Sequence, residues 1–194
     1  MQSFVLQIRA TETPRVLRPC SGCGRLSHFV SSDRFRVNAQ QKSLDVWLIY
    51  RCINCKSTWN LTVHSRVNPR QLPKDTLSSY HENDRQSAWN VAFDKAIIER
   101  AGGVIDFDVS VEFEKRYLES SEGTMRIECV HPLNLRLDRA LSSALSLSRS
   151  SIQKLAKKGQ IICEGQKTLR ALRKPVIDGQ KVKLVLQGMD GHHH

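Results

Sequence analysis

Two cysteine pairs are the part of this 194-residue chain whose spacing most clearly suggests chemistry. Cys20 and Cys23 form one Cys-x-x-Cys pair, and Cys52 and Cys55 form a second pair after 28 intervening residues. Two intervening residues let both sulfurs of a pair face one ion, so four thiolates can complete a tetrahedron around Zn²⁺. Because four thiolates fill the coordination sphere and leave no position for water, we expect a structural zinc site.

Other uses of cysteine pairs are alternatives to zinc. A cytoplasmic location, inferred below, disfavours structural disulfides. A thioredoxin-like redox motif would need one pair in a βαβ setting, whereas here two pairs lie in β-rich sequence. Four thiolates could also hold an iron–sulfur cluster.

The segments around the cysteines have the pattern of β-strands. Apolar residues alternate over 35–39 and 59–63, residues 44–50 are rich in β-formers, and Phe4–Ile8 is a further candidate strand. This arrangement resembles a zinc ribbon, in which each cysteine pair lies at the tip of a hairpin. Trp59 alternates with Leu61 and is predicted to lie in the core. Cations and aromatic residues nearby could form a nucleic-acid surface: Arg25, Arg34, Arg36, Lys42, Arg51 and Arg66, with Trp47, Tyr50 and Trp59.

The middle of the chain predicts a helix followed by an acidic hairpin. Asn83 or Asp84 caps one helix that ends at Gly102-Gly103, with Trp89 and Phe93 on its apolar face. Beyond it, apolar and acidic or polar residues alternate strictly over 105–114, as in a half-buried strand with an acidic outer face. An ordinary solvated face is the favoured interpretation. Catalytic acids, Mg²⁺ ligands or a nucleic-acid mimic are the alternatives.

The C-terminal third predicts two short helices and a hairpin. Leu137, Leu141 and Leu145 repeat at helical spacing, and Ser148 marks the start of a second helix. Gly159 ends that helix. Strands follow at 161–163 and 182–186, with a turn at Gly165.

Residues 136–186 resemble the RNA-binding domain named after ribosomal protein S-four, also called the αL motif. The resemblance rests on Arg136-Leu137-Asp138 followed by Arg139, on Ser148-Arg149, and on Lys158-Gly159. The chain has Cys163-Glu164-Gly165 where that family usually has Val-Asn-Gly, and Gly179-Gln180 where it has Gly-Asp. The resemblance implies binding to structured RNA through basic side chains, namely Arg136, Arg139, Arg149, Lys154, Lys157, Lys158, Lys167 and Arg173.

Two other functions compete with RNA binding. In a protein-interaction adaptor, the ribbon would bind a protein or ribosomal partner and Glu164 would mark a domain that has lost its RNA affinity. An RNA-modifying enzyme is less favoured, because no nucleophile–base pair or open metal site is evident in the sequence.

A second resemblance covers most of the chain. Phe35-Arg-Val-Asn-Ala, Leu44-Asp-Val-Trp-Leu-Ile-Tyr-Arg-Cys52 and Thr58-Trp-Asn resemble a bacterial family known as domain of unknown function 1062. This family brings no activity with it.

Charge and length complete the predicted organisation. The net charge of +11 is uneven: residues 1–74 carry 12 Lys and Arg against 3 Asp and Glu, residues 75–131 carry 6 against 12, and residues 132–194 carry 12 against 4. We therefore predict an α+β protein with a zinc ribbon over 1–74, an acidic connector over 75–131, an αL-type domain over 132–188 and a tail over 189–194. The tail ends in a purification-tag remnant. No apolar stretch is long enough to span a membrane and no signal peptide is evident, so a cytoplasmic location is expected.

Overall fold

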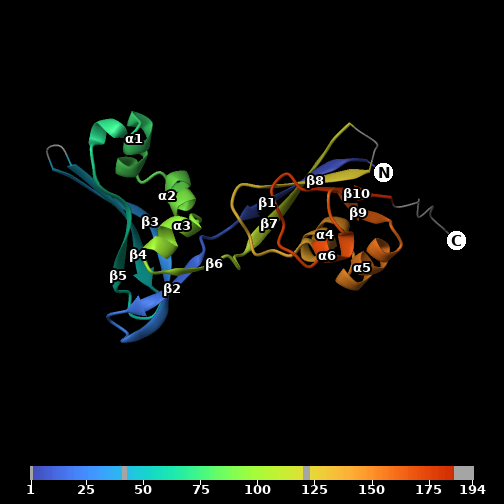
Figure 1. The fold of residues 1–194 in the computed structure, drawn as a ribbon, viewed down its shortest axis with the longest axis horizontal. Coiled ribbons are helices and arrows are strands. Elements are labelled where there is room, and N and C mark those ends of the chain that lie inside the picture. The colour runs from blue at the N-terminus through green and yellow to red at the C-terminus, as the bar shows by residue number, and fades with distance from the viewer. Residues whose placement is uncertain (1, 41–42, 120–122, 186–194) are drawn as a thin grey trace. The chain divides into compact units, whose positions relative to one another are not determined.

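The computed structural model describes residues 2–40, 43–119 and 123–185, and it divides into two compact units (Figure 1). The unit Glu12–Val109 contains both cysteine pairs and is called the cysteine unit. The other unit joins the N-terminal residues up to Thr11 with the chain from Ser110 onward, and is called the terminal unit. The predicted boundaries at 74/75 and 131/132 differ from this division, which falls at 11/12 and 109/110.

The cysteine unit is built on a five-stranded antiparallel sheet with the order β5-β4-β3-β2-β6. Its strands are β2 (Arg15–Cys20), β3 (Arg25–Gln40), β4 (Ser43–Cys52), β5 (Thr58–Val67) and β6 (Val104–Asp106). A 3₁₀ turn, η1 (Pro69–Gln71), leads from β5 into three helices: α1 (Lys74–Glu82), α2 (Arg85–Ala92) and α3 (Lys95–Arg100). The β-rich N-terminal region predicted from the sequence is therefore present.

The three helices cover one face of this sheet. Leu44, Val46, Leu48 and Tyr50 alternate along β4 as fully buried residues, in one core cluster with residues from all three helices. Trp59 packs against this core, with its ring centroid 5.1 Å from that of Tyr50, which confirms its predicted position. Alternation thus gives the sheet one face covered by helices and one face that these helices leave open.

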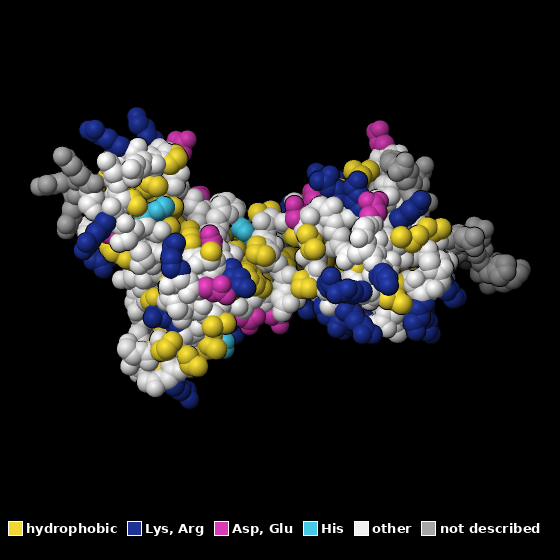
Figure 2. Space-filling view, in the orientation of Figure 1, with side chains coloured by type: hydrophobic (Ala, Val, Ile, Leu, Met, Phe, Trp, Pro, Cys, Tyr) yellow, Lys and Arg dark blue, Asp and Glu magenta, His cyan; other side chains and the backbone are white. Residues whose placement is uncertain are grey.

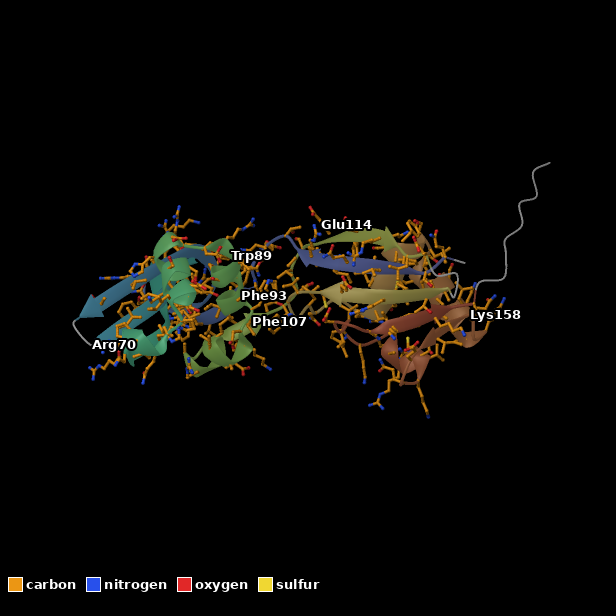
Figure 3. All side chains as sticks on the ribbon, turned by 90° about the horizontal axis from the view of Figure 1, so that it is seen from above. Arg70, Trp89, Phe93, Phe107, Glu114 and Lys158 are labelled. Atoms are coloured by element: carbon orange, nitrogen blue, oxygen red, sulfur yellow. The ribbon has the colours of Figure 1, made fainter. Side chains whose placement is uncertain are left out.

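The prediction of one continuous helix over 84–101 was wrong. The Asp84 side chain accepts a hydrogen bond from the Ser87 N–H and starts α2, whereas Asp94 accepts one from Ile97 and starts α3. Asn83 is in a left-handed conformation at the end of α1. In a continuous helix, the N–H groups from which these Asp side chains accept hydrogen bonds would bond to carbonyls of the preceding turn. Because the Asp side chains take the place of those carbonyls, a new helix begins after each Asp. Trp89 and Phe93 lie beside Phe107 in Figure 3, and the Phe93 and Phe107 ring centroids are 6.4 Å apart.

The terminal unit contains a second five-stranded sheet with the order β7-β1-β8-β10-β9. Its strands are β1 (Phe4–Ala10), β7 (Val111–Tyr117), β8 (Thr124–Cys129), β9 (Ile161–Cys163) and β10 (Lys181–Leu184). β1 lies between β7, to which it is antiparallel, and β8, to which it is parallel. The predicted first strand exists, but it pairs with strands more than 100 residues away in the sequence and not with the ribbon.

The predicted strand over 105–114 is divided between the two sheets. β6 ends at Asp106 and β7 begins at Val111. The alternation nevertheless holds in both parts: Ile105, Phe107 and Phe113 are half-buried, and the acidic residues between them are exposed. The alternation of apolar and polar residues predicts which side chains are buried. It does not predict where one strand ends and a strand of another sheet begins.

The helices of the terminal unit are α4 (Leu137–Leu145), α5 (Arg149–Lys157) and α6 (Thr168–Ala171). The first two and the strands β9 and β10 occur where the sequence predicts them, and Ser148 caps α5 as expected. α6 lies between β9 and β10 and was not predicted. Leu186, the predicted end of the last strand, and the tail over 189–194 lie outside the described residues.

Candidate metal centre and nucleic-acid interface

The four predicted cysteine ligands come together at one end of the sheet in the cysteine unit. Their sulfur atoms all lie within 4.8 Å of one another, with 3.4 Å between Cys20 and Cys55 and 3.7 Å between Cys23 and Cys52. A tetrahedral site with Zn–S distances of about 2.3 Å has sulfur–sulfur edges of about 3.8 Å. The four thiols could therefore hold a single metal ion.

The two cysteine pairs have the same backbone geometry. The Gly24 N–H donates to the Cys20 carbonyl at 2.9 Å, and the Lys56 N–H donates to the Cys52 carbonyl at 3.1 Å. Gly24 and Lys56 occupy equivalent positions, with φ angles of 65° and 64°. Each pair is thus folded into a tight turn that directs two sulfurs to one point.

Ser57 is a polar neighbour of this site that sequence reasoning missed. Its hydroxyl lies 2.6 Å from Cys55 Sγ and 3.4 Å from Cys20 Sγ. Hydrogen bonds from Ser57 lower the pKa of Cys55 to about 6 and also lower the pKa of Cys20. By contrast, the pKa of Cys23 is raised to about 11, mainly by a hydrogen bond with the Cys55 side chain. The site therefore favours thiolate, the form that binds metal, at Cys55 first.

Gly22 makes room for this arrangement. A Cβ atom at Gly22 would lie 2.7 Å from Ser57 Oγ and 2.9 Å from Cys55 Sγ. Both distances are shorter than van der Waals contact, so a larger residue would displace the hydroxyl, the sulfur or both. The signal in the sequence was the glycine between the first two cysteines, but only the structure shows what it accommodates.

Arg18 is the cation that the structure places next to the cysteines. Its guanidinium lies 4.2 Å from the Trp59 ring centroid. Burial lowers the pKa of Arg18, and the charge of Cys20 acts in the opposite direction. Lys56, which directly follows Cys55 in the sequence, donates to the Ile53 carbonyl through Nζ. The ammonium group of Lys56 is thus hydrogen-bonded to the backbone of the same turn.

A second constellation lies in the terminal unit, around a buried carboxylate. Asp138 is fully buried at the start of α4, and its Oδ2 atom lies 2.7 Å from Arg136 Nη2 and 2.9 Å from Arg149 Nη2. The two arginine side chains are 43% and 50% exposed. Asp138 thereby holds two guanidinium groups together while about half of each faces solvent.

The start of α4 is hydrogen-bonded to the segment that follows α6. The N–H groups of Leu137 and Asp138 donate to the carbonyls of Lys174 and Leu172. Since the first turn of a helix has no internal partners for its N–H groups, these two bonds satisfy donors that would otherwise be unpaired. They also place Arg173 and Lys174 close to the Asp138 constellation.

A groove of about 590 Å³ lies between α5 and α6. Its lining combines Gln153 and two leucines with four exposed cations, Lys157, Arg170, Arg173 and Lys174. None of these four cations forms a salt bridge with another described residue. Figure 2 shows Lys and Arg side chains gathered over this part of the terminal unit. We call it the basic groove.

The structure divides the eight predicted RNA-binding residues into groups. Lys157 and Arg173 line the basic groove, and Arg136 and Arg149 are paired with Asp138. The other four are exposed but do not line the groove, namely Arg139, Lys154, Lys158 and Lys167. Lys158 lies beyond the end of α5 (Figure 3). Sequence reasoning missed Arg170 and Lys174 because it predicted no helix between the last two strands.

The sequence pattern of a family described as Protein of unknown function (DUF1062) matches residues 37–167, two thirds of the chain. The chain belongs to this family. Neither the curated proteins nor the solved structures give a match. The DUF1062 match includes Cys52 and Cys55 but begins after the first cysteine pair, and it ends before Arg170 and Arg173. Each candidate site of this DUF1062 protein is therefore completed by residues beyond the matched region.

Of the four carboxylates in the predicted acidic strand over 105–114, Glu114 is the one that forms a salt bridge within the described chain, 3.1 Å from Arg9. Elsewhere in the same sheet, Glu128 on β8 lies 3.4 Å from Arg116 and 3.9 Å from Arg126. These contacts describe a mixed-charge sheet surface. Among the described helices, none is both long and apolar enough to cross a membrane.

Proposed function

We propose that this protein binds structured RNA through the basic groove and the arginine pair on Asp138. The observation that carries the proposal is the convergence of six cations from three segments: Arg136, Arg149, Lys157, Arg170, Arg173 and Lys174. Asp138 is the one carboxylate bonded to any of them in the described chain. An excess of positive charge of this kind attracts phosphate groups and releases their counterions on binding.

Spacing along α5 supports a continuous contact surface. Arg149, Gln153 and Lys157 recur every four residues and therefore lie on one face of the helix. Gln153 and Lys157 line the groove, and Arg149 reaches Asp138. The same helix face therefore links the arginine pair to the groove.

Asp138 acts in this proposal as a positioning residue. A guanidinium group has five N–H donors, so an arginine bonded to Asp138 still has donors for a phosphate. Fixing two such groups before binding lowers the conformational entropy that RNA binding would otherwise cost. The carboxylate would thus increase affinity without contacting the RNA.

The choice of RNA and the type of RNA follow from the αL resemblance. A double-helical RNA presents phosphates and 2′-hydroxyls, while its deep major groove prevents side chains from reading the bases. The targets consistent with this mode are rRNA, tRNA and ribosomal particles. The protein would recognise their shape, and no catalytic step is required.

The four-cysteine site supports a structural Zn²⁺ ion in this function. The close sulfur positions suit one ion with four thiolate ligands, whereas the ligands of an iron–sulfur cluster bind different iron atoms. Cys20 and Cys52 lie at the ends of β2 and β4, so a bound ion would join the hairpins of the sheet. The metal would stabilise the fold and would not activate water.

Filter binding to a structured RNA over a salt series tests the proposal. Contact with about six phosphates predicts that log K falls with log salt with a slope of about −4 to −5. Substituting Arg170 and Arg173 by Gln should reduce that slope by about 2, because each removed phosphate contact contributes about 1. The matched control, Lys154→Gln with Lys158→Gln, removes one charge from α5 and one just beyond its end, both outside the groove, and should change the slope by less.

The double variant Arg136→Ala/Arg149→Ala tests the arginine pair in the same assay. Binding without salt dependence, or equal losses from groove and control variants, would reject the groove as the RNA site. An absence of binding would favour the alternative in which the protein is an adaptor for a protein partner.

A further inference from the structure

The sheet face of the cysteine unit that α1, α2 and α3 leave open carries an aromatic residue with cations on the same surface. Asp45, Trp47, Ile49 and Arg51 alternate along β4 with the buried core residues and therefore point to this face. Three of the four are only half-buried, and Arg51 is exposed. We call this surface the open face.

Trp47 differs from the other two tryptophans of the chain. Trp59 packs against Phe29 and Tyr50 at the core, and the Trp89 indole N–H donates to Asp33 at 3.2 Å. The ring of Trp47 is half-buried and its contact partner is Arg36, whose guanidinium lies 5.9 Å from the ring centroid. Trp47 is thus the tryptophan available to a ligand on the open face.

Strand register places polar and cationic residues around Trp47. Arg36 on β3 and Thr62 on β5 are its direct neighbours across the sheet. Asn60 lies opposite Ile49, and Thr58 lies opposite Arg51. Arg36, Arg51 and Asn60 are exposed, so an aromatic ring, two guanidinium groups and a row of hydrogen-bonding side chains share one surface.

We propose that the open face binds an unpaired RNA strand, with a base stacked on Trp47. Stacking on an aromatic ring accepts any base, because every base has a π-face, and a positive surface follows the phosphates. Arg36 and Arg51 would contact phosphates on either side of the stacked base. Asn60, Thr58 and Thr62 offer hydrogen-bond partners for 2′-hydroxyls, which single-stranded DNA lacks.

Charge argues for RNA over a protein or a second copy of the chain as the occupant. The acidic residue that β4 contributes to this face is Asp45, and its Oδ1 accepts a hydrogen bond from the Arg66 N–H. Arg36 and Arg51 form no salt bridge with another described residue. The face therefore presents unneutralised positive charge beside an aromatic ring. It belongs to the cysteine unit, so the inference does not depend on the basic groove.

Binding of a fluorescent 12-nucleotide oligo-U, which has little secondary structure, to the full-length protein tests this inference. Trp47→Ala should weaken binding by about 5- to 150-fold, the range expected for loss of one stacked base, and Trp47→Phe should retain most of the affinity. Arg36→Gln and Arg51→Gln should each weaken binding more than Arg70→Gln. Arg70, labelled in Figure 3, is an exposed arginine of the same unit that lies in the 3₁₀ turn η1 and not on a strand of the sheet, so its variant is the matched control.

Ultraviolet crosslinking followed by peptide mapping gives an independent readout. The crosslinked peptide should contain Trp47, and a variant lacking Arg170 and Arg173 should still form this crosslink. Crosslinks confined to the terminal unit, or arginine variants no weaker than Arg70→Gln, would overturn the proposal even if Trp47→Ala failed to fold. Equal affinity for oligo-dT would overturn the assignment to RNA.

Discussion

Asp138→Asn is the substitution that most directly tests how the terminal unit is held together. Asn has nearly the same shape as Asp, so the change removes the negative charge with little change in packing. In the native protein the carboxylate is fully buried and bonded to Arg136 and Arg149 through Oδ2, while Oδ1 has no partner among the described residues. The variant therefore separates the effect of charge from the effect of volume.

The expected loss of stability follows from the two charge-assisted hydrogen bonds. Each is worth about 1.5–3 kcal/mol when the groups are shielded from water. Arg136 and Arg149 are 43% and 50% exposed, so water can replace part of the lost interaction and the contribution must be reduced. We expect Asp138→Asn to destabilise the terminal unit by about 1–3 kcal/mol.

The distribution of tryptophans allows a clean measurement. Trp47, Trp59 and Trp89 all lie in the cysteine unit, so tryptophan fluorescence during urea unfolding reports on that unit and should not change. Hydrogen exchange of peptides from α4 and α5 reports on the terminal unit and should accelerate. Glu164→Gln, which neutralises an exposed carboxylate in the same unit, is the control. Unchanged exchange in Asp138→Asn, or equal acceleration in the control, would refute the proposed role of the buried carboxylate.

The remaining predictions concern the cysteine site. Tag-free protein should contain one zinc ion per chain by elemental analysis, and Cys52→Ser should lose it together with thermal stability; absence of zinc and indifference to chelator would contradict this. Because hydrogen bonds from Ser57 lower the pKa of Cys55 from 9.0 to about 6, its thiolate contributes stability to the metal-free protein that is complete above pH 9 and is lost as the pH falls through about 6; urea unfolding of the metal-free protein across this pH range measures the loss. Gly22→Ala should cost about 1–3 kcal/mol and weaken zinc binding because of the contacts with Ser57 and Cys55. Gly24→Ala, where a Cβ meets no atom within 4 Å but φ is +65°, should cost about 1–2 kcal/mol and leave zinc affinity nearly unchanged.

Local sequence patterns correctly predicted where a helix begins or ends when a single residue, such as an N-cap serine or a glycine with positive φ, sets the backbone conformation. Ser148 begins α5 because its hydroxyl accepts the Ser151 N–H, and Gly159 follows α5 with a φ angle of 72°. The same reasoning failed over 84–101, where the apolar residues of α2 and α3 have the spacing of one helix. Asp94 was the signal that could have shown the break, since Asp is a favoured N-cap residue.

The sequence alone predicted that the four cysteines share one site, and it predicted several of the strands and helices, because the spacing of Cys-x-x-Cys pairs and the periodicity of apolar residues are local properties of the chain. Only the tertiary structure decided which strands share a sheet. β1 lies between β7 and β8 because its apolar residues are buried against partners more than 100 positions away, and no local pattern encodes that pairing. The structure likewise brought Arg170 and Lys174 to Lys157, and it placed Asp138 beneath two arginines. These charged side chains come together because segments distant in the sequence pack against one another, and residue spacing by itself does not specify that packing.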